Sequence, residues 1–199
     1  TGMGDLKIPD RSDASFVGSG AGASAGQALA CSDMNADGYD DMITSSPALD
    51  HGQGGVFIQM GNKPYGQGQS LYNADWTLTG TVDGQRVGES LVTGMNVNGD
   101  KTGDGSPIPD LLVSTLGRGG GAEALLFHGP FSDYGSRYDW YEATAVFYER
   151  YMEQGLILGN AGDFNGDGLD DLLFGSSTHK PPSRPPRPGG VFLQLGEGI

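Results

Sequence analysis

The octapeptide Gly54-Gly55-Val56-Phe57-Ile58-Gln59-Met60-Gly61 occurs twice in this chain, and the fold follows from what surrounds it. Its second copy is Gly189-Gly190-Val191-Phe192-Leu193-Gln194-Leu195-Gly196, and a looser third copy runs over residues 121–129. Each copy is a short apolar run bounded by glycine, which is typical of a β-strand. The chain therefore contains an internal repeat, and the repeat unit has to be defined before the fold.

Three further elements accompany the octapeptide. A strand-like run that starts with aspartate lies upstream of each copy, at residues 41–46, 110–115 and 171–176. A shorter apolar run precedes each of these, at residues 27–31, 90–93 and 155–158, and an acidic loop separates the two runs. A fourth strand candidate follows the first two copies, at residues 75–79 and 145–148. Each unit is predicted as strand, acidic loop, strand, turn, strand, linker and strand.

These units predict an all-β fold built from about three four-stranded β-propeller blades. Four short antiparallel strands in a unit of roughly 60 residues are typical of a propeller blade. No stretch shows a sustained helical period, and the 36 glycines among 199 residues oppose helix formation. Residues 1–199 are expected to form one region, with units at approximately 13–80, 81–150 and 151–199.

The third unit is expected to have no outer strand of its own within this sequence, since three residues follow its third strand. Two N-terminal runs, residues 5–8 and 15–18, are spare strand candidates, and residues 1–12 are a candidate to complete the last blade. Three blades are fewer than the four to eight of known propellers. We therefore expect either a partial propeller or one that is closed by association of chains.

Two of the acidic loops have the ligand pattern of a calcium site. They run over residues 33–41 and 163–171, and they agree at every polar position. Calcium takes six to eight oxygen ligands, which a loop can supply from alternate residues and from a backbone carbonyl. The predicted side-chain ligands are Asp33, Asn35, Asp37 and Asp41 in the first loop, and Asp163, Asn165, Asp167 and Asp171 in the third. Tyr39 and Leu169 would add their carbonyl oxygens.

A calcium loop between two strands fits this pattern better than an EF-hand, another metal or a metal-free turn. An EF-hand needs a glutamate at position 12 and flanking helices, but position 12 is Thr44 or Phe174 and the flanks are strand-like. Zinc is disfavoured because neither loop contains histidine or cysteine, and magnesium because it prefers to keep its waters. A turn without metal is the plain alternative, since Asp, Asn and Gly are good turn formers, but its three carboxylates would repel one another.

The second loop departs from the pattern. It starts with asparagine, and it is longer than the other two because residues 101–109 intervene before its last aspartate. A weaker calcium site here would use Asn96, Asn98, Asp100, Asp104 and Asp110. Two calcium ions are thus expected per chain, and a third ion is an open possibility.

The acidic nonapeptide followed by Asp-Leu-Leu at residues 171–173 resembles the FG-GAP repeat, the blade unit of integrin α-subunit propellers. Phe16-Val17-Gly18 and Arg86-Val87-Gly88 stand near the place of the family's Phe-Gly segment. The resemblance covers most of the chain. It implies calcium-binding loops, an extracellular location, a role in recognition or assembly, and usually seven blades.

Composition narrows the class of partner. The formal net charge of −14 argues against nucleic acid and anionic lipid, because both would repel an acidic surface. No apolar run is long enough to span a membrane. The single cysteine, Cys31, lies in an apolar run and is predicted to be buried. We expect a calcium-stabilised interaction or adhesion module, extracellular, at the cell surface or periplasmic, which binds another polypeptide or itself.

Two rival functions remain open. The chain could be an accessory propeller domain of a hydrolase such as a phospholipase, but His51, His128 and His179 suggest no catalytic arrangement and no nucleophile elbow is present. It could instead be a carbohydrate-binding propeller that uses the aromatic side chains of residues 131–141, namely Tyr134, Tyr138, Trp140 and Tyr141. The same stretch could equally be a linker packed on a blade edge. The proline-rich residues 180–188 are interpreted as a stiff surface loop.

Overall fold

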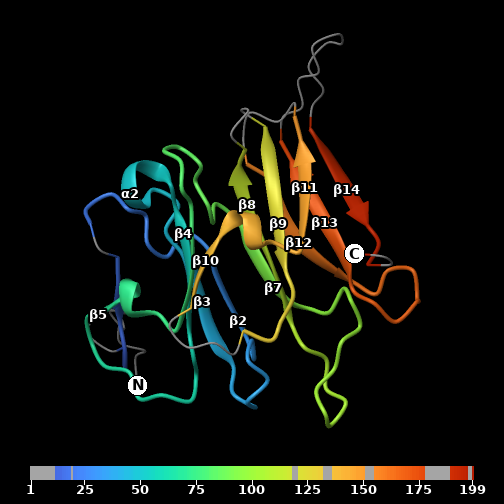
Figure 1. Ribbon diagram of the computed structural model, residues 1–199, viewed down its shortest axis with the longest axis horizontal. Coiled ribbons are helices and arrows are strands. Elements are labelled where there is room, and N and C mark those ends of the chain that lie inside the picture. Colours follow the sequence, from blue (N-terminus) through green and yellow to red (C-terminus); the bar gives the residue numbers. More distant parts are fainter. Residues whose placement is uncertain are drawn as a thin grey trace, which may run out of the picture.

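The computed structural model describes residues 12–18, 20–117, 121–131, 136–150, 155–177, 189–196 and 199. These residues form a mostly β protein with three antiparallel sheets, one small two-stranded sheet and one short helix. Figure 1 shows the three antiparallel sheets side by side in a row, in the order of the chain.

The first sheet contains the first octapeptide. Its strands β2 (Leu29–Ser32), β3 (Asp41–Ser45), β4 (Gly55–Gln59) and β6 (Trp76–Thr79) each run antiparallel to the next. The short helix α2 (Leu49–Gly52) joins β3 to β4, and β5 (Gln69–Ser70) and the 3-10 helix η1 (Leu71–Asn73) lie between β4 and β6. A fifth strand, β10 (Ser136–Asp139), comes from the second unit and pairs in parallel with β6.

The second and third sheets repeat this order. The second contains β7 (Leu91–Met95), β8 (Asp110–Leu116), β9 (Ala122–Phe127) and β11 (Ala145–Glu149), with η2 (Trp140–Glu142) before the last strand. The third contains β12 (Ile157–Gly162), β13 (Asp171–Ser176) and β14 (Gly190–Gln194). The predicted strands of all three units and their antiparallel order are confirmed, except that β12 starts two residues after the predicted run at 155–158 and continues to Gly162.

The first strands of the three sheets hold the row together. Strand β7 lies against β2 on one side and against β12 on the other, while the later strands of each sheet extend away from this line (Figure 1). Corresponding loops of the three sheets are therefore brought near one another, because each follows a first strand.

The N-terminal strand candidate at residues 15–18 forms a strand in a different place from the end of the third sheet. Strand β1 (Phe16–Val17) pairs in parallel with β5 of the first unit. The other candidate, residues 5–8, and nearly all of residues 1–12 lie outside the described residues. Within the described part of the chain, β14 pairs only with β13, so its outer edge has no strand beside it.

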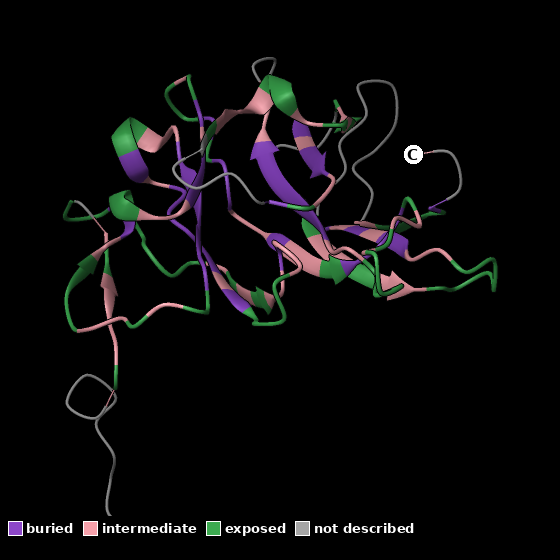
Figure 2. Cartoon of the chain, turned by 60° about the horizontal axis from the view of Figure 1, so that its bottom comes forward, coloured by how far each residue is buried: buried purple, intermediate pink, exposed green. Residues whose placement is uncertain are grey.

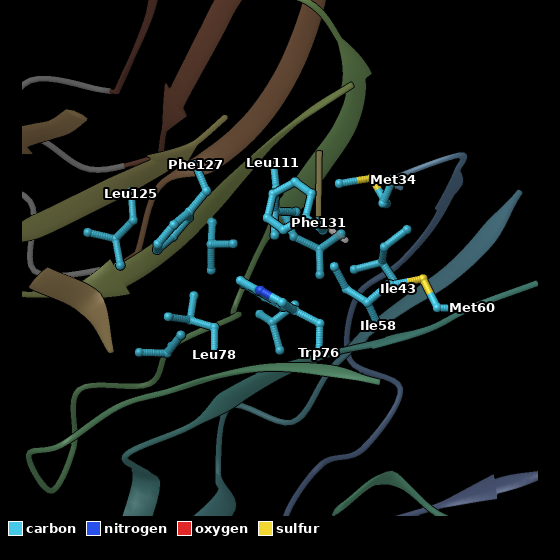
Figure 3. Packing of buried hydrophobic residues seen from close by; sticks show 14 residues of the cluster. Met34, Ile43, Ile58, Met60, Trp76, Leu78, Leu111, Leu125, Phe127 and Phe131 are labelled. Carbon is cyan, nitrogen blue, oxygen red and sulfur yellow. The ribbon is translucent and has the colours of Figure 1, made fainter. Parts of the chain in front are cut away.

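The core between the first two sheets is built around Trp76, which is fully buried. Figure 3 shows the Trp76 ring between residues of the first sheet and Leu111, Leu125, Phe127 and Phe131 of the second unit. The rings of Phe131 and Phe127 stand nearly perpendicular to it, at centroid distances of 5.0 and 6.1 Å. Edge-to-face aromatic pairs of this kind add to the stabilisation that burial provides.

The aromatic stretch before β11 packs against this same core. Tyr138 on β10 lies over Trp76 at a centroid distance of 5.0 Å, and Trp140 is partly buried against the core cluster. The interpretation of residues 131–141 as a linker on the edge of a sheet is therefore confirmed for these two aromatics. Tyr141 is exposed, whereas Tyr134 and the proline-rich loop lie outside the described residues.

Burial is uneven along the row. In Figure 2 buried residues gather where the first two sheets meet, and the end with the third sheet is mostly intermediate or exposed. The prediction that Cys31 is buried is wrong, because its thiol is exposed on β2. Leu29, two residues earlier on the same face of β2, is exposed as well. This face of the first sheet is thus left uncovered near its first strand.

Replacing Trp76 by alanine should lower the free energy of unfolding by about 3–5 kcal/mol, because it removes the largest buried side chain and leaves a cavity. Denaturant-induced unfolding followed by circular dichroism measures the change. Tyr141→Ala is the matched control, since Tyr141 is 66% exposed, and it should cost less than about 0.5 kcal/mol. Equal losses for the two variants would contradict this description of the core.

Candidate metal centre

The three acidic loops occupy the same place in the three sheets. Each connects the first strand of a sheet to the second, as β2 to β3, β7 to β8 and β12 to β13. The first and third loops also share the hydrogen bonds that their side chains at positions 1, 3, 5 and 9 accept from the loop backbone. Two separate stretches of chain therefore adopt one local structure, as their matching residues predict.

The first aspartate of each loop draws the chain into a tight turn. Asp33 accepts hydrogen bonds from the backbone N–H groups of Asp37 and Gly38, at 3.0 and 2.8 Å. Its counterpart Asp163 accepts from Asp167 and Gly168, at 3.0 and 2.9 Å. Positions 5 and 6 thus fold back onto position 1, which is how a loop wraps around a central point.

Positions 3 and 5 continue the same pattern. In the first loop Asn35 Oδ1 accepts from the Asp37 N–H at 3.0 Å, and Asp37 Oδ1 accepts from the Tyr39 N–H at 3.0 Å. In the third loop Asn165 Oδ1 and Asp167 Oδ1 accept in the same way from positions 5 and 7, at 3.0 and 2.9 Å. A carbonyl or carboxylate oxygen has two acceptor positions, so each of these oxygens retains capacity for a cation.

The aspartate at position 9 ties the loop to the third strand of its sheet. Asp41 is buried, and its two oxygens accept from the N–H groups of Met34 at 2.8 Å and Gly61 at 2.9 Å. Asp171 is equally buried and accepts from Phe164 at 2.8 Å and Gly196 at 2.9 Å. Burial raises the pKa of Asp41 above its ordinary value, and its backbone hydrogen bonds oppose that shift.

Two positions in the first and in the third loop have a left-handed backbone. Position 6 is glycine, with φ of +91° at Gly38 and +93° at Gly168, as the sequence predicts. Position 4 has the same requirement, with φ of +60° at Ala36 and +80° at Gly166. Sequence reasoning missed position 4, although the glycine at 166 and at the corresponding position 99 was the available signal. Ala36 adopts this conformation at an energetic cost that glycine avoids.

The second loop keeps part of this structure. Asp110 is buried and accepts from the Val97 N–H at 2.8 Å, as Asp41 does from Met34, and Asp100 N–H donates to Asn98 Oδ1 at 3.0 Å. Asn96, however, uses its side chain within the loop, because its amide donates to the Asp100 carbonyl at 2.6 Å and its Oδ1 accepts from Gly99 N–H at 2.8 Å.

The extra residues of the second loop form a small hairpin. The backbones of Lys101 and Pro107 pair, and Asp104 accepts hydrogen bonds from the Thr102 hydroxyl and the Ser106 N–H. This hairpin faces the first loop across an open cavity of about 280 Å³, which Asp33 and Asp104 help to line. Asp104 therefore lies toward the neighbouring loop, away from the hydrogen bonds of Asp110.

Asp110 has a partner that its counterparts lack. The Nδ1 atom of His128 lies 2.9 Å from Asp110 Oδ1, at the end of β9. Burial raises the pKa of Asp110, while the Val97 N–H and His128 favour its charged form. The sequence alone assigned His128 no partner and no catalytic arrangement. In the second loop a histidine thus stands beside the buried carboxylate, where the other two loops rely on backbone groups alone.

The third loop is docked on the second. Asp170 Oδ2 accepts from the Asn96 N–H at 2.8 Å, and the Asp170 N–H donates to the Asn96 carbonyl at 3.1 Å. Sequence reasoning assigned no role to position 8, and the Asp-Asp pair at 170–171 was the signal that could have indicated one. In the third loop, position 8 thus joins neighbouring sheets, while position 9 holds its own loop.

The donor atoms of these loops decide how well they suit a cation. Among the described residues, no group of three or more His, Cys, Asp or Glu side chains gathers closely enough to hold a metal ion. The chemistry of the donors nevertheless suits calcium, because the first and third loops offer only hard oxygen ligands. In the second loop, Asp100 Oδ1 is buried without a hydrogen-bond partner in the described part of the chain, which is unfavourable for a carboxylate unless a cation or water is present.

Comparison of the chain with protein-family models and with curated proteins finds no match. The resemblance to the FG-GAP repeat therefore depends on the repeated residues themselves.

Within the described residues, no helix has the length and apolar character needed to cross a membrane.

Replacing Asp41 by alanine should lower the free energy of unfolding by about 1–3 kcal/mol in the presence of a chelator, because the N–H groups of Met34 and Gly61 lose their acceptor. Urea unfolding measures the loss without any contribution from metal. Asp83→Ala is the control, since Asp83 is exposed and accepts its hydrogen bond from the side chain of Gln53 and from no loop backbone group among the described residues. A loss no larger than that of the control would show that position 9 does not hold the loop.

Proposed function

We propose that this chain is a calcium-stabilised protein-interaction module of the FG-GAP type, built from β-propeller blades. The observation that carries the proposal is the shared hydrogen-bond pattern of the first and third loops, which recurs at the same place in two sheets. A loop that folds its own positions 5 and 6 onto position 1 brings alternate side-chain oxygens into one short turn, where a bound cation would draw them around one centre. This is the arrangement that calcium requires of a single loop.

The assignment of the sheets as propeller blades is supported by their common order and by their contacts. Each sheet starts with the strand that lies innermost in the row, and β7 touches the first strands of both neighbouring sheets. Propellers place the first strands of successive blades around a central axis in this way. Hydrogen bonds between Asp170 and Asn96 link the loops of adjacent sheets, as a ring of blades requires.

Calcium would act here as a structural element. The first loop brings Asp33, Asp37 and Asp41 into one short segment, and the charges of the first two add to the effect of burial, which is the main cause that raises the pKa of Asp41. A divalent cation relieves this repulsion and fixes the connection between the first two strands. The two metals together would offset about four of the 14 net negative charges, taking each ion as divalent.

The proposed location is extracellular, at the cell surface or periplasmic. Extracellular calcium modules bind the ion with dissociation constants of about 0.1–1 mM, which loops with three carboxylates can achieve. In that setting calcium would keep the loops ordered and leave the remaining surface for binding a protein partner. The acidic surface favours a polypeptide over nucleic acid as that partner.

Isothermal titration with calcium should detect two ions per chain, held by the first and third loops. Asp33→Ala and Asp163→Ala should each remove one ion, and the double variant should remove both, because each aspartate is position 1 of its loop. Thermal unfolding should show the same dependence, with about 2.7 kcal/mol of added stability for each occupied loop when calcium reaches 100 times its dissociation constant.

Asp83→Ala serves again as the control and should keep both ions, since Asp83 lies outside all three loops. Magnesium at the same concentration should bind more weakly, because it requires a stricter octahedral geometry. A chain that takes up no calcium at millimolar concentration, and whose unfolding a chelator leaves unchanged, would overturn the proposal.

A further inference from the structure

Strand β1 stands where the outer strand of a preceding sheet would stand. Residues 13–29 align without a gap with residues 75–91, which contain β6 and the connection from β6 to β7. The identical pairs are Asp13 and Asp75, Gly18 and Gly80, Gly22 and Gly84, Gly26 and Gly88, and Leu29 and Leu91. In this alignment β1 corresponds to the second half of β6.

Hydrogen bonds support the same correspondence. The Gly26 N–H donates to the Ser45 carbonyl at 2.9 Å, and the Gly88 N–H donates to the corresponding Ser114 carbonyl at 2.9 Å. The Ser46 hydroxyl donates to the Ala23 carbonyl at 2.7 Å, just as the hydroxyl at the corresponding position in the next unit, Thr115, donates to the carbonyl of Gln85 at 2.9 Å. The two stretches thus join their following sheets in one way.

The pairing of β1 also follows the pattern of β6. Strand β6 is the outermost strand that the first unit itself contributes to its sheet. It pairs in parallel with β10, which lies in the linker of the next unit. Strand β1 pairs in parallel with β5, which lies in the corresponding linker of the first unit. Both β5 and β10 lead directly into a 3-10 helix and then into the outer strand of their own unit. β1 therefore has the same place relative to the first unit that β6 has relative to the second unit: each pairs with the linker strand of the unit that follows it.

A small core under β1 repeats the core between the first two sheets. It contains Phe16, Phe57, Leu71 and Ala74. The residues at the corresponding positions of the next unit are Leu78, Leu125, Trp140 and Ala143, and all four belong to the core that surrounds Trp76. The first sheet is thus prepared to pack against a preceding sheet, of which β1 is the only strand in place within the described residues.

The third sheet has an apolar face that no following sheet covers within the described residues. Four of its apolar side chains are exposed: Phe164 by 72%, Val191 by 76%, Leu193 by 41% and Leu195 by 36%. The corresponding residues of the first sheet, Met34, Val56, Ile58 and Met60, are completely buried against the second sheet. The third sheet therefore exposes the face that the first sheet buries, and its outer edge is free within the described residues.

These two incomplete ends lie at opposite ends of one row, with the second sheet between them (Figure 1). We propose that β14 of one copy pairs with β1 of a second copy, and that the third sheet of the first copy packs on the first sheet of the second. The proposal rests on the protein-binding part of the proposed function and names the partner as the chain itself.

The internal repeat also fixes the register of the proposed contact. In the first sheet Val56 pairs with Leu78 and Ile58 pairs with Trp76, in antiparallel register. The corresponding pairs between copies are Val191 with Phe16 and Leu193 with Ala14. Phe16 then lies on the same face as Val191, and it completes an apolar layer between the two sheets.

A ring of two copies has a number of sheets within the range known for propellers. Each contact is heterologous, with β14 of one copy facing β1 of the next, so every copy is paired at both ends only in a closed ring. Two copies supply six four-stranded sheets, once β1 completes each third sheet, and propellers contain four to eight. Residues 1–199 of one copy supply three such sheets and those of three copies supply nine, and both numbers fall outside that range. The expected particle is a dimer.

Disulfide trapping tests the pairing and its register. In a Cys31→Ala background, an A14C chain is mixed with an L193C chain, and mild oxidation should join them in a disulfide-linked dimer. Neither chain alone should form it, because position 14 faces position 193 of the other copy. F192C replaces L193C in the matched control and should cross-link at least tenfold less, since adjacent residues of a strand point to opposite faces.

Four results would overturn the proposal. A disulfide within one chain of the double variant A14C/L193C would mean that β1 closes its own third sheet. Dimers formed by L193C alone would mean that β14 of one chain pairs with β14 of a second chain. Equal cross-linking by F192C would contradict the register, and the absence of any cross-link would leave the exposed face for a different polypeptide.

The mass of the native particle gives an independent readout. Light scattering should find a dimer for the wild-type chain and a monomer for Val191→Lys, which places a charge on the proposed contact. Val146→Lys should remain a dimer, because Val146 is also exposed but lies on β11 of the second sheet. A wild-type chain that is monomeric at all concentrations, or a dimeric Val191→Lys, would refute the contact. Calcium titration of the same samples separates the two proposals, because the first and third loops can bind the ion in a monomer.

Discussion

The buried aspartate at position 9 of each acidic loop is the interaction on which each sheet depends. Asp41, Asp110 and Asp171 each begin the second strand, and each holds the start of its loop through a backbone N–H. Each also binds the N–H of the glycine that follows the third strand. One carboxylate thus joins three parts of its unit, and a buried carboxylate needs these donors to offset the loss of water.

The repeat made much of this structure predictable. Strand positions followed from the glycine-bounded octapeptides, and the matching residues of the first and third loops predicted that both would fold in one way. The conformation of Ala36 was not predictable from that residue alone, because alanine rarely adopts positive φ. The role of His128 was equally hidden, because its partner Asp110 lies 18 residues away and becomes a neighbour only when β8 and β9 pair.

Contacts between units were harder to predict than contacts within them. Nothing in the local pattern of residues 131–141 indicates a strand that leaves its own sheet, yet β10 pairs with β6 and places Tyr138 on Trp76. Cys31 is a second example, in which an expected contact between units is missing. Its apolar neighbours in the sequence favour burial, but burial needs a covering sheet. Within the described residues β2 is packed on β7 of the second sheet, and the Cys31 thiol stays exposed.

The two octapeptides separate the effect of a residue from the effect of its surroundings. Val56 and Val191 occupy the same position in matching strands, yet one is completely buried and the other is 76% exposed. A difference between identical residues must come from what lies beside them, which for β4 is both an outer strand and a neighbouring sheet. The apolar character of β14 is therefore that of a strand suited to the same two neighbours, and leaving that surface in water forgoes the stabilisation that burial gives its counterpart.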